Sequence, residues 1–132
     1  MKVLYVFFLL LLPGIHQDIQ DPIDKTAELL KNGNITELAK TFAPEVDLTI
    51  LGNEDSYPAA KAEEILANFF RQNQPRTAKI LHRITSNANY RFGVVLLTTS
   101  NGTYRVSFNL RNSGGHFEMN DIHIESEKQN NP

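Results

Sequence analysis

Apolar residues follow one another without interruption over 3–12, directly after Lys2. A positive charge, an apolar run of this length and then Pro13-Gly14 are typical of a secretory signal peptide. As a helix the run would be about 15 Å long, roughly half the hydrocarbon thickness of a bilayer, which argues against a stable membrane anchor. We therefore expect a signal peptide at 1–17 and export to the periplasm or the medium. The alternative is an uncleaved amphipathic segment at the membrane surface.

Three helices are predicted downstream from apolar residues spaced by three and four positions. The first covers 21–33, with Asp21 as a suitable N-cap, and the second covers 34–43, with Asn34 as its N-cap. The third covers 56–73 and has the clearest amphipathic pattern, because its large apolar residues share one face. We expect these helices to cover one face of a sheet.

Period-two alternation of apolar and polar residues predicts five strands. The first covers 46–50, between the second and third helices, and a loop is expected at 52–55. Asn101-Gly102 predicts a tight hairpin turn later in the chain, because both residues tolerate positive φ. Four strands after the last helix are expected to form a meander: 78–86, 90–99, 104–110 and 117–126.

The strand predicted at 90–99 is apolar on both faces from Phe92 to Leu97. A strand with one face in water would alternate instead, so this one is expected at the centre of the sheet or at a contact between two copies. Since helices cover only one face, the other face needs cover, and we expect a homodimer through the sheet. A strand buried within the monomer is the alternative.

Composition is compatible with a single domain at 18–127 followed by a disordered polar tail at 128–132. The 132-residue chain has no cysteine, which excludes disulfides and thiolate metal sites. Its formal net charge of -2, with both signs interspersed, argues against a nucleic-acid partner. The predicted fold class is α+β, with N-terminal helices packed on a strongly curved, mainly antiparallel sheet.

The order of elements and three sequence segments resemble the nuclear transport factor 2-like superfamily, also called the cystatin-like α+β cone. The segments are Gly33-Asn34, the Phe-Ala-Pro-Glu-Val run at 42–46, and the helix at 62–70 with its Phe-Phe pair. Within the superfamily, the chain resembles small exported bacterial domains of unknown function. The resemblance implies a conical pocket that members use for isomerisation, dehydration, hydrolysis or ligand binding, commonly as dimers. It assigns no catalytic residue here, and fold alone does not determine function.

Four side chains are candidates for lining a ligand pocket: Tyr57, His82, Tyr104 and Phe108. Strict alternation places His82 on the same face as Ile80, where an imidazole in the cavity would act as a general base or bind a ligand. A core histidine bonded to a backbone carbonyl is the alternative. The tyrosines suit an amphipathic cavity, although ordinary packing with one hydrogen-bonded hydroxyl also explains them.

These features predict a non-enzymatic exported domain that binds a small apolar or amphipathic ligand in the cone, or another protein through the sheet. The alternative is a small cofactor-free enzyme, isomerase-like or hydrolase-like, that uses His82 and a pocket carboxylate. Such an enzyme needs at least two converging ionisable groups in its cavity, and the sequence offers one good candidate. We predict no cofactor and no metal site.

Overall fold

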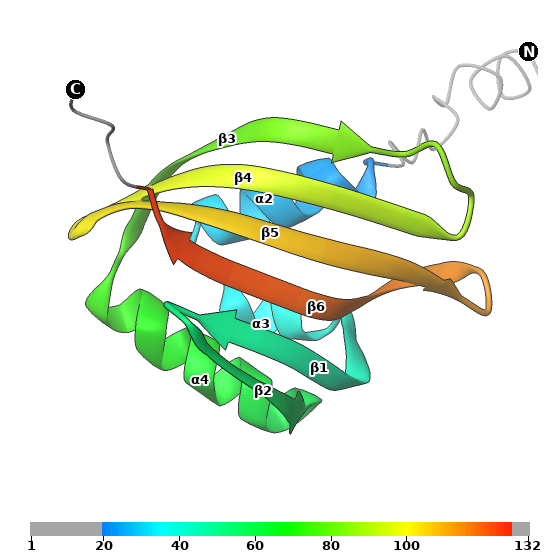
Figure 1. The fold of residues 1–132 in the computed structure, drawn as a ribbon, viewed down its shortest axis with the longest axis horizontal. Coiled ribbons are helices and arrows are strands. Elements are labelled where there is room, and N and C mark those ends of the chain that lie inside the picture. Colours follow the sequence, from blue (N-terminus) through cyan, green and yellow to red (C-terminus); the bar gives the residue numbers. More distant parts are fainter. Residues whose placement is uncertain (1–19, 128–132) are drawn as a thin grey trace, which may run out of the picture.

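The computed structural model describes residues 20–127, which fold into three helices and one six-stranded sheet (Figure 1). The signal peptide predicted at 1–17 and the tail predicted at 128–132 lie outside these residues. The elements are, in chain order, α2 (Pro22–Lys31), α3 (Ile35–Ala39), β1 (Phe42–Ile50), β2 (Asn53–Pro58), α4 (Ala59–Gln72), β3 (Pro75–Ile84), β4 (Tyr90–Thr99), β5 (Gly102–Ser113) and β6 (His116–Ser126). None of the helices within 20–127 is both long and apolar enough to cross a membrane.

The first two helices begin at the predicted caps. The Asp21 carboxylate accepts a hydrogen bond of 2.8 Å from the backbone N–H of Ile23, and the Asn34 side chain accepts one of 3.3 Å from Glu37. Each bond satisfies a backbone donor that the first turn of a helix leaves without an intrahelical partner. Between the two helices Gly33 has φ 63°, a conformation that costs glycine little and other residues more.

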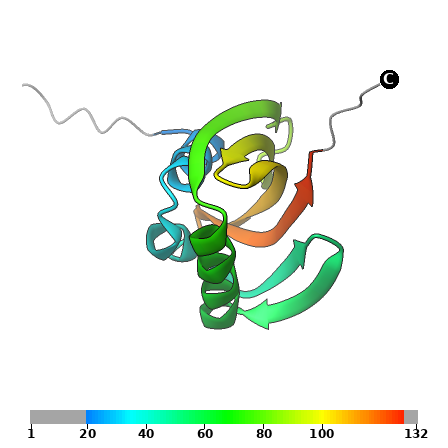
Figure 2. The same cartoon turned by 90° about the vertical axis from the view of Figure 1, so that its left-hand side faces the viewer.

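The sheet has the strand order β2-β1-β6-β5-β4-β3. The last four strands form the predicted antiparallel meander, whereas β1 pairs parallel to β6 and antiparallel to β2. The helices lie on one side of this sheet, and the strands bend around them (Figure 2). The predicted α+β class, with helices on a curved and mainly antiparallel sheet, is therefore confirmed.

The loop predicted at 52–55 is wrong, because β2 begins at Asn53 and pairs with β1 along its length. Leu51 and Gly52 form a two-residue hairpin turn, with φ values of 50° and 89°. Positive φ at both positions is typical of the tight turns that join antiparallel strands, but leucine rarely adopts it. The sequence therefore lacks the usual signal for a tight turn. Because β2 extends to Pro58, the last helix begins at Ala59 and not at the predicted residue Ser56.

Strand β1 begins at Phe42, earlier than the predicted residue 46. The second helix correspondingly ends at Ala39, earlier than the predicted residue 43. Pro44 has no N–H to donate to a neighbouring strand, which made a strand at this point improbable from sequence. The register of β1 against β6 shifts between Phe42 and Asp47. This irregularity accommodates Pro44, since prolines within sheets occur at edges and bulges.

The core lies between the helices and the inner face of the sheet. In β4, Val95 and Leu97 point inward and are fully buried, so the remaining apolar residues of that strand face the other side. Phe108 of β5 is opposite Gly93 of β4, and a Cβ atom on Gly93 would lie 2.6 Å from Cζ of the phenylalanine ring. The same Cβ would lie 3.0 Å from the side chain of Ile23, so glycine allows both groups to approach this strand.

Replacing Gly93 with alanine tests this contact. The added methyl group would overlap the ring of Phe108, so we expect Gly93→Ala to lower the free energy of unfolding by about 1–3 kcal/mol. Phe108→Leu removes part of the overlap, and the double variant should be more stable than the sum of the single changes implies. Urea denaturation of the four proteins measures this coupling. Additive effects would contradict a direct contact.

Candidate functional site

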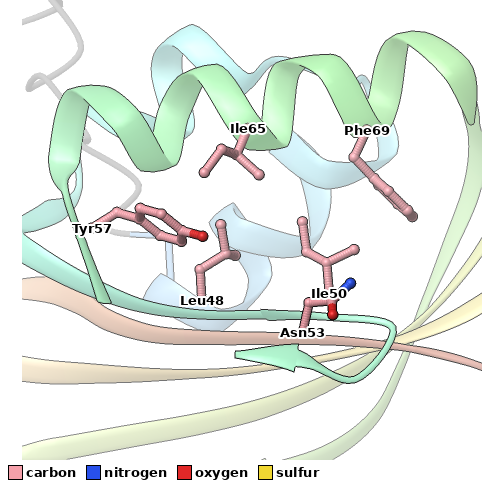
Figure 3. Close-up of a pocket in the computed structure, with 6 residues that line it drawn as sticks. All are labelled: Leu48, Ile50, Asn53, Tyr57, Ile65 and Phe69. Carbon is pink, nitrogen blue, oxygen red and sulfur yellow. The ribbon is translucent and has the colours of Figure 1, made fainter. Parts of the chain in front are cut away.

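A cavity of about 280 Å³ lies between helix α4 and the hairpin of β1 and β2 (Figure 3). Six residues line it: Leu48, Ile50, Asn53, Tyr57, Ile65 and Phe69. It lies at the side of the sheet where β2 forms the edge, so its two walls come from segments that are adjacent in the chain. The cavity occupies the α4 side of the space between the helices and the sheet, where the family resemblance implies a conical pocket.

The spacing of these residues along the strand and the helix places their side chains on the faces that border the cavity. Leu48 and Ile50 alternate on the inner face of β1, while Ile65 and Phe69 are four residues apart and share one face of α4. In Figure 3 the two helix residues point toward the hairpin. The ring of Phe69 is further oriented by edge-on contacts, with centroid distances of 5.2 Å, to two neighbouring aromatic rings, Phe70 and Tyr104.

The polar groups of the cavity are a phenol and an amide. The hydroxyl of Tyr57 points into the space between helix and hairpin, and Asn53 lies at the opposite end of the cavity (Figure 3). Among the described residues, no charged side chain lines this cavity. The arrangement can bury the apolar part of a ligand and offer uncharged hydrogen-bond donors and acceptors to its polar group.

The four predicted pocket residues do not converge on this cavity. Tyr57 lines it, whereas Tyr104 lies behind Phe69 and donates a hydrogen bond of 3.0 Å to the side-chain oxygen of Asn73. Phe108 is only 1% exposed, and its ring belongs to the packed centre of the cone. Of the predicted tyrosines, one therefore meets the cavity directly and one supports its wall.

His82 lies on the other face of the sheet, contrary to the prediction from strict alternation. Ile80 pairs with Val95, but His82 pairs with Val94, so Leu81 is an extra residue in β3. Such a bulge shifts the alternation by one position, and the imidazole turns to the exposed outer face. The pairing of His82 with a carboxylate inside the cone, on which the enzyme alternative depended, is therefore not present.

Sequence reasoning missed Asn53 as a cavity residue, because it was placed in a loop. Its partner in the hairpin register is Ile50, and this pairing brings the amide to the cavity. The aliphatic and aromatic lining residues were predicted, but as core positions. Nothing in a periodic pattern separates a side chain that fills a core from one that borders a cavity.

The outer face of the sheet is divided into two halves of different chemistry. On β3 and β4 it carries apolar side chains, including Ile84, which is 53% exposed, and the partly buried Phe92 and Leu96. On β6 and β1 it carries the neighbouring carboxylates of Asp121 and Asp47. No three acidic or histidine side chains within 20–127 are arranged to hold a metal ion.

Asp121 is electrostatically the most distinctive group of this outer face. Partial desolvation raises the pKa of the Asp121 carboxyl, and the carboxylate of Asp47 adds to the rise. His123 opposes it, and Glu54 adds a further increment. The Asp47 carboxylate itself accepts a hydrogen bond from the Ser56 hydroxyl across the hairpin.

A family model fits nearly the whole of this architecture: it matches residues 23–125 and is described as a domain of unknown function, DUF4783. The chain belongs to this family. The match covers all three helices from Ile23 onward and the sheet up to the last residues of β6. No curated protein matches the sequence.

Solved structures of DUF4783 proteins have the same fold. One from Bacteroides uniformis is 24% identical and aligns over 83% of this chain and 100% of its own, with a TM-score of 0.78. One from Bacteroides fragilis is 27% identical and aligns over 82% of this chain and 100% of its own, with a TM-score of 0.75.

A more distant structure has a similar fold. A domain of unknown function with a cystatin-like fold from Nostoc punctiforme is 9% identical, covers 81% of this chain and 74% of its own, and has a TM-score of 0.63. The cystatin-like fold predicted from the family resemblance is thereby confirmed. These similarities establish the fold of this DUF4783 domain.

The raised pKa of Asp121 predicts how stability depends on pH. Because the folded state holds this proton more tightly than the unfolded state does, the ionised carboxylate destabilises the fold at neutral pH. Asp121→Asn should therefore raise the melting temperature at pH 7. The gain should vanish below about pH 3.9, the ordinary pKa of aspartate, where the carboxyl is protonated in both states.

Glu63→Gln, which removes a carboxylate from α4, is the matched control for the change in net charge. Melting curves of the three proteins between about pH 3 and pH 8 separate the two effects, because this range spans the ordinary pKa of both acids. An equal gain in both variants would show that the effect is one of net charge and not of the Asp121 environment.

Proposed function

We propose that this DUF4783 domain binds a small, uncharged, amphipathic molecule in the cavity between α4 and the β1–β2 hairpin. The observation that carries the proposal is the lining, in which four large apolar side chains surround one phenol and one amide. Cavities that bind small molecules are mostly apolar and contain a few polar groups that orient the ligand. A charged ligand would lose its hydration here and find no opposite charge among the lining residues.

The volume sets the size of the ligand. Since one water occupies about 30 Å³ of the liquid, the cavity has room for about nine water-sized groups. A molecule with on the order of ten non-hydrogen atoms therefore fits. Burial of each 100 Å² of its apolar surface would contribute about 2.5 kcal/mol, and a hydrogen bond to Tyr57 about 1 kcal/mol more.

The enzyme alternative has less support. It requires a base and a second ionisable group that converge inside the cone. His82, the predicted base, is on the outer face, and among the described residues the cavity is lined by no carboxylate, imidazole or ammonium group. Shape and hydrogen bonding are what this site provides.

Binding of 1-naphthol, an uncharged fluorescent phenol of suitable size, tests the proposal. We expect wild-type protein to bind it, and Tyr57→Phe to weaken its binding about fivefold, which corresponds to the loss of one hydrogen bond. Naphthalene lacks the hydroxyl, so its affinity should be nearly the same for both proteins. Fluorescence titration measures all four affinities.

Ile65→Asn provides the second arm, because a polar group on the apolar wall should weaken the binding of both compounds. Ala60→Asn places the same residue on an exposed position of α4 and serves as its control. Circular dichroism shows whether each variant is folded. Equal affinity of 1-naphthol for wild type and Ile65→Asn would refute binding at this cavity.

We further propose that the outer face of the sheet mediates self-association, as a homodimer. The apolar residues Ile84, Phe92 and Leu96 lie there with no helix over them. Lys79 is on the same face of β3, at the opposite side of the sheet from the acidic strands β6 and β1. A two-fold axis along β5 would place β3 and β4 of one copy over β1 and β6 of the other, so that Lys79 lies over the acidic side and the face is complementary to itself.

Leu96→Lys tests this second candidate. Replacing this apolar side chain with an ammonium group, which would lose its hydration at the interface, should raise the dissociation constant at least about tenfold, which equals 1.4 kcal/mol. Ala60→Lys adds the same charge on α4, away from the sheet, and should leave association unchanged. Sedimentation equilibrium of the three proteins gives the constants. A wild-type protein that stays monomeric at about 100 µM would refute the proposal.

Export is also part of the proposed function, with the segment at 1–17 as the cleaved signal peptide. In that compartment the domain would meet its ligand outside the cytoplasm. The absence of cysteine is compatible with such an environment, since no thiol is available for oxidation.

A further inference from the structure

A second cavity, of about 170 Å³, lies between α2 and the ends of β5 and β6 that are remote from the first cavity. Its walls come from four separate segments of the chain: the start of α2, the turn before β1, and strands β5 and β6. The lining residues are Gln20, Pro22, Lys25, Thr26, Leu29, Thr41, Leu110 and Phe117. No residue is shared with the cavity beside α4.

The floor of this cavity is apolar and its surroundings are basic. Leu110 is 2% exposed, and Leu29 and Phe117 are half-buried beside it. Lys25 lines the cavity from an exposed position on α2. The guanidinium of Arg91 lies 4.9 Å from the centroid of the Phe117 ring, which places a second positive charge against the same wall.

Neither of these two cations has a carboxylate within salt-bridge distance among the described residues. Within 20–127 neither Lys25 nor Arg91 forms a salt bridge, and the guanidinium donates hydrogen bonds only to backbone oxygens. Of the acidic residues of α2, Asp24 is neutralised by its ion pair with Arg83, whereas Glu28 accepts a hydrogen bond from the neutral amide of Gln20 and keeps its charge at the rim of the cavity. Arg83 also lowers the pKa of Asp24, which keeps that pair ionised.

The hydroxyl groups of the wall are occupied as donors. Thr26 donates to the carbonyl of Pro22 and Thr41 to that of Leu38, at 2.8 and 2.7 Å. Each hydroxyl oxygen can therefore still accept a hydrogen bond but has no proton left to donate. Among the side chains that line the cavity, the one that can donate to an anion with a positive charge is Lys25. Charge and polarity in this cavity are therefore arranged for an anion at the mouth and an apolar group on the floor.

We propose that the second cavity binds a small carboxylate with a short apolar tail. The carboxylate lies against the ammonium group of Lys25, and the tail packs on Leu110 and Phe117. The volume corresponds to about five or six water-sized groups, which suits a chain of roughly that many carbon atoms. This site is independent of the neutral, larger cavity of the proposed function, and the two differ in the charge they select.

Titration of the isotope-labelled protein with hexanoate, followed by amide NMR, tests the proposal. Shifts should map to Lys25, Leu29, Leu110 and Phe117, with a dissociation constant in the millimolar range that such a small ligand allows. Hexan-1-ol has the same tail without the charge, and we expect it to bind at least about threefold more weakly.

Lys25→Gln removes the charge and leaves a polar side chain that is one atom shorter, so it should abolish the preference for hexanoate over the alcohol. Lys31→Gln, on the last turn of the same helix, should leave that preference intact. Because both positions are exposed, neither change should affect folding, and a wild-type-like amide spectrum confirms this.

Three outcomes would overturn the proposal. They are an equal affinity for acid and alcohol in the wild type, an unchanged preference in Lys25→Gln, and shifts confined to α4 and the β1–β2 hairpin. The last outcome would assign the carboxylate to the first cavity and would contradict the neutral selectivity proposed there. Failure of 1-naphthol to bind would leave the hexanoate result unaffected, so the two proposals fail separately.

Discussion

The approach of Phe108 to Gly93 is the contact on which the arrangement of helices and sheet depends. With no Cβ on Gly93, both the ring of Phe108 and the side chain of Ile23 on α2 approach the strand closely at this point. Helix α2 can therefore lie close to β3 and β4 (Figure 1). A side chain at this position would overlap Phe108 and press on Ile23.

This packed centre explains why the cone has no single deep pocket. Phe108 and its buried neighbours fill the middle, and the two cavities described above lie on either side of it. One cavity lies beside α4 and has neutral polar groups, and the other lies beside α2 and is flanked by cations. The fold therefore leaves two cavities whose linings differ in charge, because close packing fills the centre between the helices and the sheet.

The two faces of the sheet differ in chemistry because helices cover only one of them. Helices cover the inner face, so its side chains form core and cavity walls, whereas the outer face meets solvent with both apolar and acidic halves. A single extra residue, Leu81, moves His82 from one face to the other. The chemistry available to a cavity therefore depends on strand register as much as on composition.

Local signals in the sequence determined the helices and the meander: caps at Asp21 and Asn34, the apolar face of α4, and the alternation in the last strands. These signals act between residues close in the chain, so periodicity reveals them. Tertiary structure alone decided the parallel pairing of β1 with β6, the hairpin turn at Leu51 and the bulge in β3. Each of these depends on hydrogen bonds to a distant strand or on a strained conformation that packing maintains, and neither leaves a periodic pattern. The cavities belong to the same category, because an empty space is defined by the side chains that meet around it.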